Sequence, residues 1–143
     1  MGAEMILKEN IKQSIAQPGD VANILVALLM AEDNISRDRE HFWVLGLNAQ
    51  KMIKYIELSS LGTLTMSLIH PRETFRLAIG KGCNSIIVAH NHPSGDPTPS
   101  KDDKTITKRL QAAGDLLGIQ VLDHVIIGTE GQFFSFSLKG LLK

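Results

Sequence analysis

Two histidines and one downstream aspartate are the residues of this sequence that could do chemistry together. His90 and His92 end an apolar run, and side chains at positions i and i+2 of a strand point to the same face. A segment rich in proline, glycine and serine then leads to Asp103, in the first turn of a predicted helix. Because this stiff loop can return the helix start to the imidazoles, the pattern predicts two nitrogen ligands, one oxygen ligand and an open fourth position, as in a catalytic zinc site.

Each part of this pattern also has a purely structural explanation. Ser100 followed three residues later by Asp103 is a variant of the capping box, in which the two residues bind backbone N–H groups at a helix start. A single histidine beside a loop is commonly a hydrogen-bonded surface residue. Asp102 directly precedes Asp103 and is the alternative oxygen ligand. Spacing alone therefore leaves the metal site and the structural explanation open.

The composition indicates one ordinary globular domain. The 143 residues are 43% hydrophobic and 21% charged, and 15 basic residues balance 15 acidic ones, which argues against a dedicated nucleic-acid binder. Cys83 is the single cysteine, so no intrachain disulfide can form, and we expect a packing role for it in a reducing compartment. The sequence shows no leader peptide, myristoylation signal or membrane-length apolar run, so we expect a soluble, cytoplasmic protein.

Upstream of the histidines, hydrophobic periodicity predicts a mixture of helices and strands. A short helix or strand should end in a turn at residues 17–19, and Asp20 should be the N-cap of a helix that reaches about Glu32. The charged residues 33–39 are a predicted loop. Beyond it we expect three strands and one helix, at residues 40–47, 52–58, 62–69 and 71–81. The helix should bury one face, made by Phe75, Ala78 and Ile79.

The strand that carries the histidines is the predicted centre of the sheet. Residues 84–90 include an unbroken apolar run, which indicates a strand covered on both faces. The helix after the loop should run from about Lys101 to Leu117 and end at Gly118. Two more strands should follow, at 119–127 and 132–137. This order predicts one α/β domain with a mixed sheet flanked by helices. The buried face of the last helix should be Ile106, Leu110, Ala113 and Leu117.

Taken together, these residues resemble a known family. The spacing His90-x-His92, seven residues, Ser100, two residues and Asp103 is similar to the JAMM (or MPN+) metalloprotease motif, and residues 90–97 resemble its RadC branch. The likeness extends over about residues 20–143, which leaves 1–19 as an N-terminal extension. It implies the JAMM/MPN fold, a cytidine-deaminase-like arrangement. Further RadC-like residues lie at 40–42, 62–64, 70–73, 123–128 and 134–136.

The resemblance also implies roles for individual residues. His90, His92 and Asp103 would hold one Zn²⁺ per chain, with a water in the fourth position. Glu40 corresponds to the family's glutamate and would be the general base, with Glu57 as the next candidate; from the residues alone, Glu40 is also a solvated carboxylate at a strand end. Ser100 would donate a hydrogen bond to the developing oxyanion. The implied activity is that of a zinc-dependent peptidase or isopeptidase-like hydrolase acting on a peptide or protein.

Two departures from the family pattern limit which of the family's properties can be expected of this chain. Asn91 stands between the histidines where deubiquitinase members often have serine or threonine, so ubiquitin-type substrates do not follow. Residues 1–39 are too short for the helix-hairpin-helix segment of fuller RadC proteins, and we expect at most weak DNA contact.

Other functions and residue roles also remain open. The alternative functions are a DNA-repair-associated accessory protein, supported by basic residues on the 101–117 helix, and a binding module with a structural metal. Asp123 and His124 either support the site or form a hydrogen-bonded pair on a sheet edge. His41 and His70 receive no role.

Overall fold

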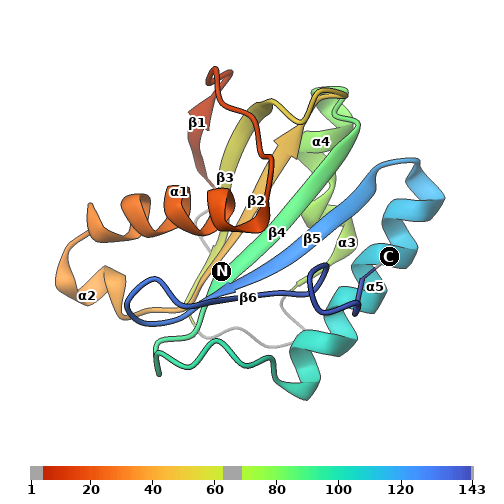
Figure 1. The fold of residues 1–143 in the computed structure, drawn as a ribbon. Coiled ribbons are helices and arrows are strands. Elements are labelled where there is room, and N and C mark those ends of the chain that lie inside the picture. Colours follow the sequence, from red (N-terminus) through yellow and green to blue (C-terminus); the bar gives the residue numbers. More distant parts are fainter. Residues whose placement is uncertain (1–4, 63–68, 143) are drawn as a thin grey trace.

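The computed structural model describes residues 5–62 and 69–142, which form a six-stranded sheet with helices on both faces (Figure 1). The strand order is β1-β3-β2-β4-β5-β6, with β4 and β5 parallel and the other neighbouring pairs antiparallel. This confirms the predicted single α/β domain with a mixed sheet. The strands are β1 (Met5–Glu9), β2 (His41–Leu47), β3 (Ile53–Leu61), β4 (Ser85–Asn91), β5 (Gln120–Ile127) and β6 (Phe133–Ser135).

The helices divide between the two faces of the sheet. They are α1 (Pro18–Met30), α2 (Asn34–Arg37), α3 (Pro71–Thr74), α4 (Arg76–Gly80) and α5 (Lys101–Leu117). α1 packs on the core that contains Trp43 and Leu45, whereas α3, α4 and α5 cover the core that contains Phe42 and Val44 (Figure 1). Across residues 5–62 and 69–142, no helix has the length and apolar character needed to cross a lipid bilayer.

β4 lies inside the sheet and carries the first of the two predicted histidine ligands. Every residue of β2 and β4 is buried, as the unbroken apolar runs predicted for strands covered on both faces. Val88 packs in the α5-side core, so His90, two residues on, points toward α5. Ala89 packs in the α1-side core, so Asn91 points toward α1. Neighbouring residues of one strand therefore serve opposite faces of the sheet.

The structure corrects the predicted start of the first helix. α1 begins at Pro18 with Gln17 as its N-cap, so Asp20 is not the N-cap. Asp20 lies in the first turn, and its carboxylate accepts hydrogen bonds from the backbone N–H groups of Ala16 (2.9 Å) and Gln17 (3.1 Å). Pro18 suits the first helical position because its missing N–H would have no partner there.

Other element boundaries also differ from the predictions. Residues 33–39 are not wholly a loop, because α2 forms one turn there, with Asp33 accepting from the Ser36 N–H (2.7 Å). β3 continues past the predicted end to Leu61, and the predicted strand at 62–69 lies largely outside the described residues. The N-terminal segment adopts the strand alternative, β1, paired with β3. The division into an extension (1–19) and a domain (20–143) stays a prediction.

The predicted helix over 71–81 is two short helices. α3 and α4 meet at Phe75, whose backbone (φ −93°, ψ −5°) departs from α-helical geometry. Phe75 and Ala78 are buried as predicted, but Ile79 is 55% exposed, so its assignment to the buried face is wrong. The helical period does not continue across the break at Phe75. The sequence spacing, which assumes one continuous helix, therefore places Ile79 on the buried face.

α5 has the predicted boundaries. Gly118 ends it with φ 74°, a left-handed conformation that favours glycine. Ile106 and Leu110 are buried as predicted and Ala113 is partly buried, whereas Leu117 is exposed. The chain reverses at Gly118, and Ile119 enters the core in place of Leu117.

Candidate metal centre

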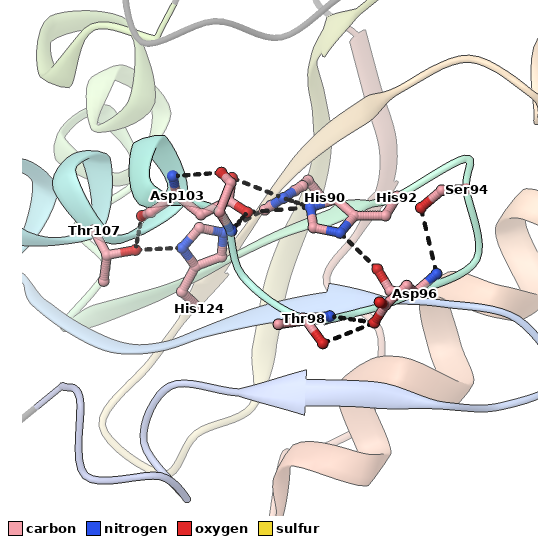
Figure 2. A network of polar contacts seen from close by, with 9 residues as sticks. His90, His92, Ser94, Asp96, Thr98, Asp103, Thr107 and His124 are labelled. Carbon is pink, nitrogen blue, oxygen red and sulfur yellow. Dashed lines mark hydrogen bonds and ion pairs between the residues drawn. The ribbon is translucent and has the colours of Figure 1, made fainter.

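Three side chains meet where β4 ends and α5 begins (Figure 2). His90 Nε2 lies 3.0 Å from His92 Nε2 and 3.2 Å from Asp103 Oδ1, and His92 Nε2 lies 3.1 Å from Asp103 Oδ2. Among the described residues, this is the one group of three His, Cys, Asp or Glu side chains whose ligand atoms lie within 4.8 Å of one another. We call these residues the triad. Asp103, and not Asp102, contacts both imidazoles.

The second ring nitrogen of each triad histidine is held by another part of the chain. His92 Nδ1 donates to the backbone carbonyl of Asp96 (2.8 Å), so Nε2 of the neutral ring carries a lone pair. His90 Nδ1 lies 2.8 Å from His124 Nε2 on β5, and His124 Nδ1 lies 2.6 Å from Thr107 Oγ1 on α5. We call His90, His124 and Thr107 the histidine chain (Figure 2).

The loop between His92 and α5 is fixed by hydrogen bonds of its own and by contact with the β5–β6 turn. The Thr129 N–H donates to the Gly95 carbonyl (2.8 Å), and Asp96 Oδ1 accepts from the N–H (3.0 Å) and hydroxyl (2.7 Å) of Thr98. Gly95 has φ 92°, and a Cβ atom there would collide with the Thr129 side chain. The loop therefore returns the start of α5 to the histidines, as its proline and glycine content predicted.

Asp103 serves the triad and the helix cap at once. The Ser100 N–H donates to Asp103 Oδ2 (2.8 Å), and Ser100 Oγ accepts from the Asp103 N–H (3.0 Å), so the predicted capping box is present. The structural explanation and the ligand explanation of this spacing are therefore compatible. Because the Ser100 oxygen is the acceptor in the cap, its hydroxyl hydrogen remains available to donate.

The contacts within the triad shift the pKa values of its members. The hydrogen bond with Asp103 raises the pKa of His92 against the opposing effect of burial. Burial would raise the pKa of the Asp103 carboxyl, but hydrogen bonds with His90 and His92 hold it well below its usual range. Burial lowers the pKa of His124 well below its ordinary value, so that ring is neutral at physiological pH. A carboxylate and imidazole lone pairs converging at one point favour a bound cation.

The triad lines a pocket that contains the other two predicted site residues. Glu40 and Ser100 border the same cavity of about 450 Å³. Glu40 directly precedes β2, and the pairing of Phe42 with His90 places the start of β2 beside the end of β4. The structure thus brings all five predicted site residues to one pocket. Its apolar wall is formed by Phe42, Ile69, Pro93 and Ile106.

Comparison with known proteins identifies the family of the chain. A family model of the RadC-like JAB domain matches residues 15–141. The chain belongs to this family. The RadC resemblance predicted from the motifs is therefore confirmed.

Three curated relatives show how far the similarity extends. The chain is 50% identical over 127 residues to a UPF0758 protein of Caldanaerobacter subterraneus subsp. tengcongensis, covering 89% of this chain and 52% of the relative. It is 51% identical over 114 residues to a UPF0758 protein of Desulforamulus reducens, covering 80% and 50%. The identity to a UPF0758 protein of Staphylococcus haemolyticus is 47% over 131 residues, covering 91% and 55%. The chain spans about half the length of the curated relatives it matches.

In this RadC-like JAB domain, a second polar network holds the backbone around Glu40. Asn91 Oδ1 accepts from the His41 N–H (2.6 Å), and Asn91 Nδ2 donates to the Arg39 carbonyl (3.0 Å). The buried His41 ring lies 2.7 Å from Glu32 Oε1 and 2.8 Å from the Arg39 carbonyl. Asn91 therefore binds the backbone on both sides of Glu40. We call Asn91, His41, Arg39 and Glu32 the Asn91 network.

Asp123 and His124 point to opposite faces of the sheet. The two residues are hydrogen-bonded, since the His124 N–H donates to Asp123 Oδ1 (2.8 Å), but β5 lies between β4 and β6, so the predicted position on a sheet edge is wrong. His124 supports the triad, whereas the Asp123 carboxylate accepts hydrogen bonds from the Ser135 hydroxyl (2.6 Å) and the Ser137 N–H (2.9 Å). The adjacent residues therefore have separate roles.

Sequence reasoning gave no supporting role to Thr107, Asn91 or His41. All three are buried, at 2%, 4% and 0% exposure, and buried polar side chains need hydrogen-bond partners. The signal in the sequence that could have indicated these roles is a polar residue at a position where the pattern predicts a buried one. Thr107 directly follows the core residue Ile106 of α5, and Asn91 continues the apolar run of β4.

Proposed function

We propose that this chain is a zinc-dependent hydrolase of the JAMM type that cleaves amide bonds in peptides or proteins. The observation that supports this is the convergence of two imidazole nitrogens and a carboxylate in one pocket with Glu40 and Ser100. This donor set, with a further position open toward the pocket, suits Zn²⁺. When bound, Zn²⁺ supplies a water whose pKa lies near 7.

The residues around the triad have complementary tasks in this proposal. Glu40 is partly exposed to the pocket, and its carboxylate accepts a proton from the attacking water and returns it to the leaving amine. The Ser100 hydroxyl donates to the oxyanion that develops on the scissile carbonyl. Asp103 stays ionised because of its lowered pKa, which keeps both carboxylate oxygens available as ligands.

Glu57, the other candidate base, is less suited to proton transfer. It is buried on β3, with its carboxylate 3.6 Å from the Arg76 guanidinium, and it is not among the described residues that line the pocket. A carboxylate remote from the pocket cannot reach an attacking water there. Glu40 is therefore the proposed general base.

Zinc content and amide cleavage test this proposal together. We expect about one zinc per chain in the purified protein by elemental analysis, and cleavage of members of a random peptide library, read by mass spectrometry. Glu40→Gln should keep zinc and the fold but lose about 10²–10⁴ in rate, because an amide cannot accept the proton. Glu57→Gln, checked for folding, is the control and should keep its rate per folded molecule. Wild-type protein that binds no zinc would contradict the metal site, and full activity in Glu40→Gln would contradict the base.

A DNA-associated accessory role is the second candidate function. The observation that favours it is that Lys101, Lys104, Lys108 and Arg109 are all exposed on α5. With a net charge of zero, few phosphates can be neutralised, so we expect weak, non-specific binding that disappears as salt rises through physiological values. A tight, sequence-selective and salt-tolerant gel shift would favour this function over the hydrolase.

A cytoplasmic location is part of the same proposal. Cys83 is a free, buried thiol, which fits a compartment that keeps cysteines reduced. Cell fractionation with an antibody against the chain would test this, and recovery outside the cytoplasm would contradict it.

A further inference from the structure

The hydrogen bonds of the histidine chain can run in one direction only. The Thr107 hydroxyl donates to the Asp103 carbonyl (2.7 Å), since a carbonyl oxygen can only accept. A hydroxyl has one hydrogen, so Thr107 Oγ1 must accept from Nδ1–H of His124 (2.6 Å). A neutral histidine ring with its proton on Nδ1 has a lone pair on Nε2, and burial without exposed surface favours this uncharged form of His124. Its Nε2 therefore accepts from Nδ1–H of His90 (2.8 Å).

From this direction we infer that His124 and Thr107 are positioning residues that hold His90 in its Nδ1–H tautomer, with the Nε2 lone pair directed at the metal. The inference rests on the proposed metal site. It gives a function to two buried polar side chains on different elements, β5 and α5. It also links two ligands of the triad, because the Thr107 hydroxyl binds the backbone of Asp103 itself.

The histidine chain prevents the ring proton of His90 from moving from Nδ1 to Nε2. His90 Nε2 lies 3.2 Å from Asp103 Oδ1, so a ring released from His124 would place its proton on Nε2 and donate it to that carboxylate. The proton would then occupy the position between two metal ligands, and a metal ion would have to displace it. By accepting from Nδ1, His124 keeps the proton on the far side of the ring.

Packing keeps His124 in place. Its ring stacks on Phe136 with centroids 4.7 Å apart and planes 8° from parallel, and it has no exposed surface. His92 differs, because its Nδ1 donates to the Asp96 backbone carbonyl in a loop. Only the support of His90 is made by side chains, so substitutions can remove it selectively.

Cobalt titration of the metal-free protein tests the inference with a readout other than activity. His124→Phe keeps an aromatic ring beside Phe136 but removes the acceptor for His90, and it should weaken Co²⁺ binding by about 10- to 100-fold. His124→Gln restores an acceptor and should recover part of this loss. Thr107→Val keeps the side-chain shape and should weaken binding in the same direction by less. Thr105→Val is the matched control, because the Thr105 hydroxyl likewise donates to a backbone carbonyl of α5 (Lys101, 3.0 Å) but is exposed and outside the histidine chain, and it should leave Co²⁺ affinity unchanged.

The tautomer of His90 can be observed directly by ¹⁵N NMR of the imidazole rings in the metal-free protein. We expect the Nδ1–H form in the wild type and a shift toward the Nε2–H form in Thr107→Val, which is the variant closest to wild type in shape. Unchanged tautomer and unchanged affinity in Thr107→Val would overturn the inference, even if His124→Phe does not fold. Wild-type protein that binds no Co²⁺ would count against the proposed function, and the tautomer measurement would still decide the role of His124.

Discussion

The two polar networks that meet at β4 use the same residue types for different purposes. On the α5 face, the triad and its supports direct two ring nitrogens and a carboxylate toward one point in a pocket. On the α1 face, the Asn91 network joins Asn91 and His41 to backbone groups and to Glu32. The first network concentrates acceptor atoms where a cation can bind, and the second holds a segment of backbone.

The alternation of side chains along β4, from one face of the sheet to the other, explains how both networks fit beside one another. His90 and His92 lie on one side of Asn91, which contacts the residues flanking Glu40 from the other side of the sheet. The α5-face network should therefore control metal binding, and the α1-face network should control the position of the base. Substitutions in each network should separate these two properties.

The largest expected effect is loss of metal through the triad. His92→Ala and Asp103→Asn should no longer retain stoichiometric zinc through purification, because each removes one of three ligands. Asp102→Asn is the matched control and should keep the metal, since Asp103 makes the contacts with both imidazoles. Elemental analysis of the four proteins, wild type included, measures this. Metal retained in Asp103→Asn but lost in Asp102→Asn would assign the ligand to the other aspartate.

Asn91→Ala should have the opposite effect to the triad variants: it should lose activity and keep the metal. It removes the hydrogen bonds on both sides of Glu40, so the proposed base is displaced while the triad is intact. A small misplacement of a catalytic group can cost about 10²-fold in rate, and we expect a loss of that order with zinc unchanged. Rate per folded molecule and zinc content, measured on the same preparation, check this.

The control for Asn91→Ala is Ser135→Ala. Ser135 is buried and donates to Asp123, so its loss should lower stability without reaching Glu40. Denaturant unfolding should show that the free energy of unfolding falls by about 1–3 kcal/mol in each variant, since each leaves buried polar groups unpaired. Zinc lost from Asn91→Ala, or an equal loss of rate in Ser135→Ala, would mean that the two networks do not have separate roles.

The pH dependence of metal binding tests which ligand of the α5-face network a proton can occupy in place of the metal. The pKa of His92 is raised in the metal-free protein, so near that pKa a proton competes with the metal for Nε2. The pKa of Asp103 is lowered, so its carboxylate remains ionised and adds no competing proton over this range. Metal affinity should therefore fall as pH decreases, by about tenfold per unit once His92 is protonated. Competition with a chelator at several pH values measures it, and a flat profile would exclude His92 as a ligand.

The part of this site that sequence could predict is the part encoded locally. His90 and His92 share a strand face, and Ser100 and Asp103 share a helix start, so short-range spacing was enough to bring them together. The unbroken apolar runs of β2 and β4 likewise predicted buried strands, as the structure has them.

The supports of the site depend on contacts between distant segments. His124 reaches His90 because β5 lies parallel to β4, with an irregularity in register between Ile86 and Ile87 that spacing does not reveal. Asn91 and Arg39 are joined across the β2–β4 pair. The break at Phe75 was missed for a related reason: no proline or glycine marks it, and α3 and α4 are positioned by packing on the sheet.

Ser100→Ala should give the smallest loss of stability, and it tests whether the helix cap and the pocket share one hydroxyl. The Ser100 oxygen accepts from the Asp103 N–H, so its removal should lower the free energy of unfolding by about 1 kcal/mol. If the hydroxyl hydrogen also donates to the oxyanion, the rate per folded molecule should fall as well, while zinc remains. Ser100→Thr keeps the hydroxyl and a good N-cap and should restore both properties. A lower unfolding midpoint with an unchanged rate would leave Ser100 as a cap alone, and oxyanion stabilisation would then have to come from another group on the pocket wall.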